Sequence, residues 1–281
     1  MTNKYQNINF DLNRLPTMPL VAAQMMELFN MPDSSAGRMA RVISKDAAVT
    51  ARVLKIANSS FYSMSRTVSS LPTAIVILGE RTLRNLVLAA SMRGMNQTFG
   101  AVEKMLWEDS MVCALGSRFL AHKLGVADPE EAFMAGLFRH IGLVVLNNQD
   151  QQAGDFIISA ITSHGKNMAN RERDLFGATH AEIGAAVLEC WKLSEILSLV
   201  ALHHKDGALP ADACDDAVKL SALINIAGAF PAYFGIFGVQ RELDLESFYG
   251  IQTLNLDPAE LATYMKDFKG IFDENRSDFL S

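Results

Sequence analysis

The stretch Ala132-Phe133-Met134-Ala135-Gly136-Leu137-Phe138-Arg139-His140-Ile141-Gly142 decides how the rest of the chain is interpreted. It is apolar on both sides of one Arg-His pair, and it continues into Leu143-Val144-Val145-Leu146. A run that is apolar all round is typical of a buried helix. Two basic side chains in such a helix are costly unless a partner binds them or they face a cavity. The sequence therefore places its main functional question at Arg139 and His140.

The composition argues against a nucleic-acid partner. The 281 residues carry 25 Lys and Arg against 31 Asp and Glu, so the formal net charge is −6. Nucleic-acid binding needs clustered Lys and Arg that neutralise phosphates, and the basic residues of this chain are scattered. We therefore expect no nucleic-acid partner.

The cysteines favour a reducing compartment. Cys113, Cys190 and Cys214 are an odd number and have no Cys-x-x-Cys spacing, so neither disulfides nor a cysteine zinc site is expected. Each cysteine lies in a helical pattern and is expected to be a small buried side chain. These features predict a cytoplasmic location.

No membrane contact is expected either. The N-terminal residues 1–6 lack the apolar core of a signal peptide. Residues 221–240 carry no charge, but Pro231 lies near their middle and would break a spanning helix. We interpret this segment as a buried helix followed by an aromatic loop.

Hydrophobic periodicity predicts an all-α protein. Apolar residues recur at helical spacing in nearly every patterned segment, and no segment alternates with period 2 over the length of a strand. Asp128-Pro129 and Ser194 are predicted helix caps, whereas residues 166–178 are expected to be irregular. Glycines at 94 and 100 suggest a boundary between an N-terminal helical part, to about residue 98, and a larger helical bundle from about residue 103.

Five polar residues occupy suggestive places in these helices: Arg139, His140, His180, His203 and His204. Histidines at the ends of apolar helices can converge in the core of a bundle, and helical bundles build metal sites in this way. A two-metal phosphohydrolase also needs carboxylate ligands. The apolar run 132–146 supplies none.

The chain resembles the HDOD domain family. The N-terminal motifs that carry the resemblance are Leu15-Pro16-Thr17-Met18-Pro19, Ser44-Lys45-Asp46, Ala57-Asn58-Ser59, Ala74-Ile75 and Leu78-Gly79. Further along, the matching residues are Trp107, Ser110, Ala135-Gly136-Leu137, Ile141-Gly142, His180, Gly184, Trp191 and His203-His204. The resemblance implies an HD-superfamily-like helical bundle with an N-terminal helical subdomain over residues 14–210. It leaves residues 211–281 as a C-terminal helical extension packed on the bundle.

The HDOD family is similar to the HD and HD-GYP phosphohydrolases, which hold metal through a His-Asp pair. The resemblance implies that this pair falls at Arg139 and His140, and that another ligand histidine falls near Asp109 or Ser110. His180, His203 and His204 match later ligand positions. Residues 205–210 lack the Gly-Tyr-Pro of the cyclic-dinucleotide phosphodiesterases.

These departures predict a protein without catalysis of its own. Arginine has no lone pair to give a metal, and its charge would repel a divalent cation at short range. We therefore expect a non-catalytic regulator in bacterial signal transduction that acts through protein–protein contacts, with no metal and no cofactor.

Two alternatives stay open. In the first, the residual pocket of Arg139, His140, His180, His203 and His204 serves a metal-dependent phosphohydrolase, or a sensor that binds a nucleotide or another small anion through the guanidinium. In the second, Arg139 pairs with Asp109, Glu131 or Asp174, and the histidines are only structural.

Overall fold

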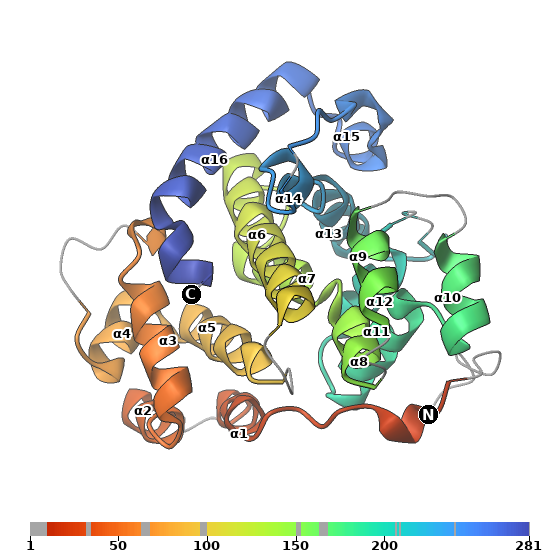
Figure 1. The fold of residues 1–281 in the computed structure, drawn as a ribbon. Helices are drawn as coiled ribbons and strands as arrows, with labels where there is room; N and C mark the ends of the chain where they lie inside the picture. The colour runs from red at the N-terminus through yellow and green to blue at the C-terminus, as the bar shows by residue number, and fades with distance from the viewer. Residues whose placement is uncertain are drawn as a thin grey trace. The chain divides into compact units, whose positions relative to one another are not determined.

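The computed structural model describes residues 10–31, 35–62, 68–95, 100–149, 153–162, 168–205, 207, 209–238 and 240–280. Within these ranges the regular elements are α-helices and short 3-10 helices, and no strand occurs. The predicted all-α class is therefore confirmed (Figure 1). Among the helices of the described residues, none is both long and apolar enough to traverse a lipid bilayer.

The chain forms two compact units. The first comprises Met1–Thr17 and Thr98–Met265, and the second comprises Met18–Gln97 and Lys266–Ser281. The last boundary falls inside a single helix, α16 (Pro258–Leu280). The assignment of residues 14–210 to one domain and 211–281 to an extension stays a prediction, and the structure groups Lys266–Ser281 with the N-terminal helices.

The second unit consists of short helices from Met18–Gln97 together with the C-terminal residues Lys266–Ser281. Its helices are α1 (Leu20–Phe29), α2 (Ala36–Ile43), α3 (Ala47–Ala57), α4 (Leu71–Leu78), α5 (Glu80–Arg93) and the later part of α16, with a 3-10 turn, η3 (Ser60–Tyr62). Asp46 caps α3 by accepting hydrogen bonds from the amides of Ala48 and Val49. Within this unit, Lys55 Nζ on α3 donates to the Ser277 carbonyl oxygen on α16 at 2.9 Å.

The first unit contains the longer helices and the Arg-His pair. Its elements are η2 (Leu12–Arg14), α6 (Ala101–Leu124), α7 (Pro129–Phe138), α8 (Ile141–Gln149), α9 (Gly154–Thr162), α10 (Met168–Phe176), α11 (His180–Cys190), α12 (Glu195–His203), α13 (Asp215–Ala227), α14 (Phe230–Tyr233), η5 (Leu245–Ser247), α15 (Tyr249–Leu254) and the start of α16. Helix α6 packs on α7 and α13, while α11 packs on α8 and α12 (Figure 1).

Two glycines allow these helices to approach closely. A Cβ atom at Gly136 on α7 would lie 2.8 Å from the backbone of Ala114 on α6. A Cβ atom at Gly142 on α8 would overlap the carbonyl oxygen of His180 at the start of α11. Only glycine permits such backbone contact without displacement, so Gly142 sets how near α8 lies to His180.

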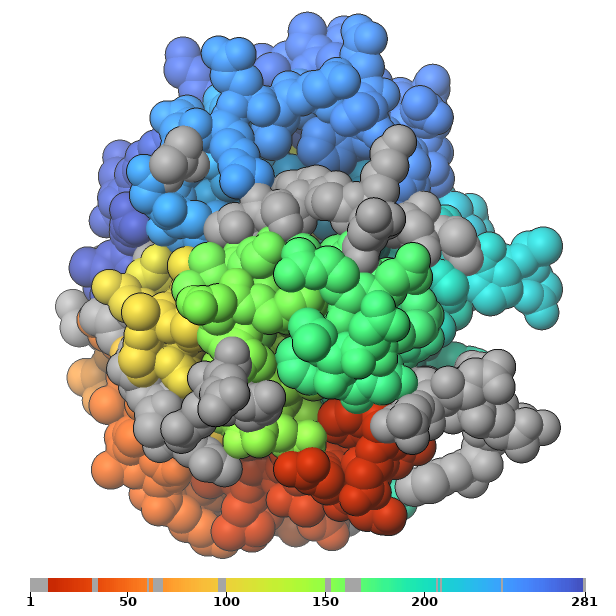
Figure 2. All heavy atoms as spheres, turned by 45° about the vertical axis from the view of Figure 1, so that its right-hand side comes forward, coloured from red at the N-terminus to blue at the C-terminus, as the bar shows by residue number. Residues whose placement is uncertain are grey.

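The N-terminal segment of the first unit is anchored by two side chains. Trp191 Nε1 donates to the Pro16 carbonyl oxygen at 2.8 Å, and Gln149 Nε2 donates to that of Arg14 at 3.1 Å. Figure 2 shows this segment (red) beside the green α8–α10 region. Between them lies a cleft of about 330 Å³ lined by Phe10, Asp11, Arg14, Leu146, Gln149, Leu175 and Phe176.

Three local expectations were wrong. The run 132–146 is two helices and not one, because Arg139 and His140 form the turn between α7 and α8. Residues 168–176, expected to be irregular, form α10; its buried Glu172 side chain accepts from the amide of His180 at 2.9 Å, a tertiary contact that local polarity does not reveal. Cys113 is buried, but Cys190 and Cys214 are exposed because they lie at helix ends.

Candidate functional site

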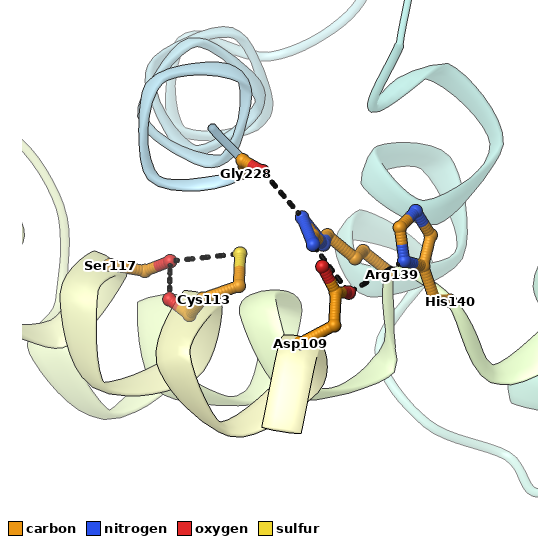
Figure 3. A network of polar contacts seen from close by, with 6 residues as sticks. All are labelled: Asp109, Cys113, Ser117, Arg139, His140 and Gly228. Atoms are coloured by element: carbon orange, nitrogen blue, oxygen red, sulfur yellow. Dashed lines mark hydrogen bonds and ion pairs between the residues drawn. The ribbon is translucent and has the colours of Figure 1, made fainter. Parts of the chain in front are cut away.

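One carboxylate, that of Asp109 on α6, binds both members of the Arg-His pair (Figure 3). Asp109 Oδ2 accepts a hydrogen bond from Arg139 Nη2 at 2.5 Å and lies 2.7 Å from His140 Nδ1. Arg139 Nη1 also donates to the carbonyl oxygen of Gly228, just after α13, at 3.3 Å. Of the three acids considered as partners of Arg139, Asp109 is therefore the one that pairs with it.

The Asp109–Arg139 pair keeps both side chains charged in the core. Burial alone would raise the pKa of Asp109, but Arg139 and His140 outweigh it and hold this pKa well below its usual range. Burial acts to lower the pKa of Arg139, yet the adjacent Asp109 carboxylate raises it overall. The guanidinium of Arg139 thus stays protonated, and the carboxylate of Asp109 balances its positive charge.

Three buried imidazoles, those of His140, His180 and His204, converge beside this pair. One ring nitrogen from each lies within 4.8 Å of the other two. The ring centroids of His140 and His204 are 5.2 Å apart, those of His180 and His204 are 5.4 Å apart, and those of His140 and His180 are 5.5 Å apart. The three rings therefore form a nearly equilateral group.

Helix ends position these imidazoles. A capping box begins α11: Thr179 Oγ1 accepts from the amide of Glu182 at 3.1 Å, and Glu182 Oε2 accepts from that of Thr179 at 2.8 Å. His180 is consequently the first residue of that helix. Ser194 caps α12 as predicted, and His204 follows the last residue of α12.

Each imidazole contacts an oxygen atom outside the group of three rings through its Nδ1 atom, and we call this its outer contact. His140 Nδ1 contacts Asp109, His180 Nδ1 lies 2.5 Å from Glu172 Oε1, and His204 Nδ1 lies 2.8 Å from the carbonyl oxygen of Ala201. Because carboxylates and carbonyls only accept, we assign the proton to Nδ1 in all three rings. The lone pair is then on Nε2, and the buried Nε2 atoms of His180 and His204 have no hydrogen-bond partner in the described part of the chain.

The three histidines are neutral at physiological pH. Burial lowers the pKa of His140 to about 3, with the Arg139 charge acting in the same direction. Burial also lowers the pKa of His180, helped by Lys205, and that of His204, helped by His140 and His180. Neutral imidazoles are the form that can give a lone pair to a metal.

Of the five residues singled out in the sequence, the structure brings Arg139, His140, His180 and His204 together and leaves His203 outside. His203, the last residue of α12, is half-buried and lies outside the imidazole group. Glu172 and Gly228 were not anticipated, because each reaches the site from a separate helix and no spacing links it to Arg139 or His180. Asp206 and Ala208, in the loop compared with Gly-Tyr-Pro, lie outside the described residues.

The side chains do not fit the metal set of the HD phosphohydrolases. A guanidinium bound to Asp109 replaces the expected ligand histidine, and His140 replaces the expected aspartate. Among the described residues, what remains is a different donor set, composed of three imidazoles.

Comparison with known proteins identifies the family. The sequence profile of the HDOD domain matches residues 15–206. A curated relative, an uncharacterized protein of Treponema pallidum (strain Nichols), is 24% identical over 200 residues, which are 69% of this chain and 38% of that protein. The chain thus spans well under half the length of this relative.

Solved structures share the fold. An HDOD domain protein of unknown function from Geobacter sulfurreducens has a TM-score of 0.73 at 24% identity, covering 93% of both chains. A proposed phosphohydrolase from Shewanella amazonensis SB2B has a TM-score of 0.70 at 26% identity, covering 95% of this chain and 96% of that one. A proposed signal transduction protein from Marinobacter aquaeolei VT8 has a TM-score of 0.67 at 21% identity, covering 98% of this chain and 62% of that one.

The profile match covers well over half of the chain, and it includes the Arg139-His140 turn, His180 and His204. The chain therefore belongs to the HDOD domain family, which is related to the HD phosphohydrolases.

Proposed function

We propose that this protein is a non-catalytic regulatory protein of the HDOD type that acts through protein–protein contacts. The observation that carries the proposal is the buried Asp109–Arg139 ion pair, because the resemblance assigns the metal-binding His-Asp pair of the HD phosphohydrolases to Arg139 and His140. A guanidinium has no lone pair for a metal, and Asp109 is already engaged by both Arg139 and His140.

The same contacts weaken the anion-sensor alternative. A guanidinium recognises a phosphate with its two parallel N–H groups, but Arg139 directs Nη2 at Asp109 and Nη1 at the carbonyl oxygen of Gly228. An anion would have to displace a buried carboxylate from its partner, and such exchanges cost several kcal/mol, on the order of 3–5.

The names given to the similar structures point to two different roles, one regulatory and one hydrolytic. The Marinobacter aquaeolei protein is named as a proposed signal transduction protein, whereas the Shewanella amazonensis protein is named as a proposed phosphohydrolase. The second name keeps a metal-dependent phosphohydrolase as the competing function for this chain.

A hydrolase assay separates the two functions. Purified protein is incubated with nucleotides, cyclic dinucleotides and a generic phosphodiester, with Mn²⁺, Ni²⁺ or Fe²⁺ present. We expect no product above that of a buffer blank. Turnover by the wild type that disappears in an Arg139→Ala protein, while His203→Gln keeps it, would contradict the proposal.

The protein-contact part needs its own measurement. A partner recovered with immobilised protein from the native host is purified and its binding is measured by calorimetry. Val76 and Ile77 are exposed apolar side chains on α4, with relative exposures of 80% and 41%. We expect a Val76→Glu, Ile77→Glu protein to bind the partner at least tenfold more weakly, whereas a Leu175→Glu protein, changed at another exposed apolar residue, should bind as the wild type does. Equal binding by all three proteins would contradict this contact.

A further inference from the structure

The core of the first unit contains two nitrogen lone pairs that no described residue satisfies. The Nε2 atoms of His180 and His204 are buried and have no hydrogen-bond partner among the residues that the structure describes. A buried polar atom without a partner costs about 1–3 kcal/mol, and native proteins contain few of them. Two such atoms in adjacent rings therefore need a partner that takes lone pairs, either an O–H or N–H donor or a cation, and the Nδ1 contacts of the rings favour the cation.

The outer contacts of the imidazoles are those of metal ligands. A metal-binding histidine almost always donates its other ring N–H to a carboxylate or a carbonyl, which fixes the ring and its tautomer. His140 has Asp109 in this role, His180 has Glu172, and His204 has the carbonyl oxygen of Ala201. All three rings thus present Nε2 as the nitrogen available to an ion.

On this basis we propose that His140, His180 and His204 together bind one first-row transition-metal ion, with Zn²⁺ as the reference ion. Imidazole nitrogen suits Zn²⁺, Cu²⁺, Ni²⁺ and Fe²⁺, whereas Mg²⁺ and Ca²⁺ prefer oxygen. Three protein ligands leave a fourth position for water. The donor set differs from the His-Asp pair of the HD phosphohydrolases, because position 139 supplies no ligand and position 140 supplies an imidazole.

The distances require only a small closure of the site. Nitrogen ligands at about 2.0–2.1 Å from a tetrahedral Zn²⁺ lie about 3.4 Å apart, and the ring nitrogens here lie within 4.8 Å of one another. A movement of about 1 Å by each imidazole therefore reaches the geometry of the bound ion. The rings come from the α7–α8 turn, the start of α11 and the residue after α12. A bound ion would therefore link these three helix ends.

The local charge permits a cation. The sequence argument against a metal was the repulsion from Arg139, but the Asp109 carboxylate neutralises that guanidinium at contact distance. Glu172 and Lys205 are the other charged groups near His180, and their charges also oppose each other. The four charges therefore sum to zero, although Arg139 still acts against a positive charge at His140, as Lys205 does at His180 and His204.

Metal binding is measured on the full chain after removal of metal with a chelator. The readouts are isothermal titration with Zn²⁺, elemental analysis after dialysis, and the visible absorption of the Co²⁺-loaded protein. We expect one ion per chain, a rise in melting temperature on adding Zn²⁺, and Co²⁺ bands of tetrahedral intensity. His180→Gln and His204→Gln proteins should each bind at least 100-fold more weakly.

Matched variants keep this test decisive. His203→Gln removes the neighbouring histidine outside the group and should leave the affinity unchanged. Asp109→Asn keeps all three ligands but weakens the outer contact of His140, and should reduce affinity about 10–100-fold. Circular dichroism in the chelator shows whether each variant is folded before titration.

Three results would overturn the inference: no Zn²⁺ binding by the folded wild type, equal loss of binding in His203→Gln and His204→Gln, or a melting-temperature rise with inorganic phosphate and none with Zn²⁺. The inference is independent of the proposed function. Metal binding without hydrolysis supports both, whereas hydrolysis by the loaded protein contradicts the regulator and leaves the metal site standing.

Discussion

The carboxylate of Asp109 and the guanidinium of Arg139 are in direct contact in the interior of the first unit, at 2.5 Å, with each side chain only 3% exposed. Removing one member of a buried ion pair leaves the other charge uncompensated. We expect Arg139→Met and Asp109→Asn each to lower the free energy of unfolding by about 3–5 kcal/mol. Urea denaturation in the presence of a chelator measures this.

The double variant distinguishes a true pair from two separate defects. Asp109→Asn with Arg139→Met removes both charges, so its loss should be smaller than the sum of the two single losses by at least about 1 kcal/mol. Losses that simply add would show that the two charges do not stabilise each other.

Gly142 gives a prediction about packing. A methyl group at this position overlaps the His180 carbonyl oxygen, so Gly142→Ala must push α8 from α11. We expect destabilisation of about 1–3 kcal/mol, the range of an overpacked core, and weaker Zn²⁺ binding because His140 and His180 move apart. Thermal unfolding and titration measure the two effects.

A matched glycine supplies the control. Gly37 lies within α2, and a Cβ atom there meets no atom within 4 Å. Gly37→Ala should therefore stabilise the protein by about 0.5–1 kcal/mol. If both variants shifted stability in the same direction, close packing would not be the reason for glycine at 142.

The three cysteines should differ in reactivity. Burial raises the pKa of the Cys113 thiol, with Asp109 acting in the same direction, while Arg139 and Ser117 oppose them. The reactive form is the thiolate, so Cys113 should stay unreactive near pH 8.5, the usual pKa of a thiol, where exposed thiols react. An aromatic disulfide reagent should titrate two thiols in the native protein, the exposed Cys190 and Cys214, and three in denaturant.

The control for this count is Cys113→Ser, in which native and denatured protein should both show two thiols. Three reactive thiols in the native wild type would mean that the core around Asp109 opens readily.

The second unit depends on the end of α16. Truncation after Met265 removes the Ser277 carbonyl oxygen that binds Lys55 and the Phe279 ring, whose centroid lies 5.7 Å from that of Phe61. We expect the thermal melting curve of the truncated protein to show two transitions. The full-length Lys55→Met protein loses only one of these contacts, so its melting curve should lack the earlier transition. A single transition at the wild-type temperature would show that these contacts contribute nothing.

The apolar periods and helix caps were enough to predict the helical class, and the HDOD motifs predicted the family. Asp109 was predicted as one of three partners for Arg139, because a buried guanidinium needs an acid. The imidazole group was only half predicted: His203 and His204 are adjacent, and sequence alone does not decide which one turns inward at the end of α12. Glu172 was missed because its helix, Met168–Phe176, is mostly polar in sequence, and because its role rests on a contact with His180, eight residues away.

The prediction that no metal binds rested on the positive charge of Arg139, which the Asp109 carboxylate neutralises in the folded protein. In the sequence, Arg139 is a cation among histidines. In the structure, Asp109 comes from thirty residues earlier and cancels it. A tertiary contact of this kind cannot be read from spacing along one helix.

The division of the chain inside α16 has a consequence for synthesis on the ribosome. Domains generally fold as units, the N-terminal one first. Here Met18–Gln97 emerges early, yet its unit is completed only by Lys266–Ser281. At about 5–20 residues per second, the early helices wait on the order of ten seconds or more for their last contacts. The first unit, whose residues Thr98–Met265 are translated in between, can therefore fold first, and chaperones that hold nascent chains have their longest opportunity on Met18–Gln97.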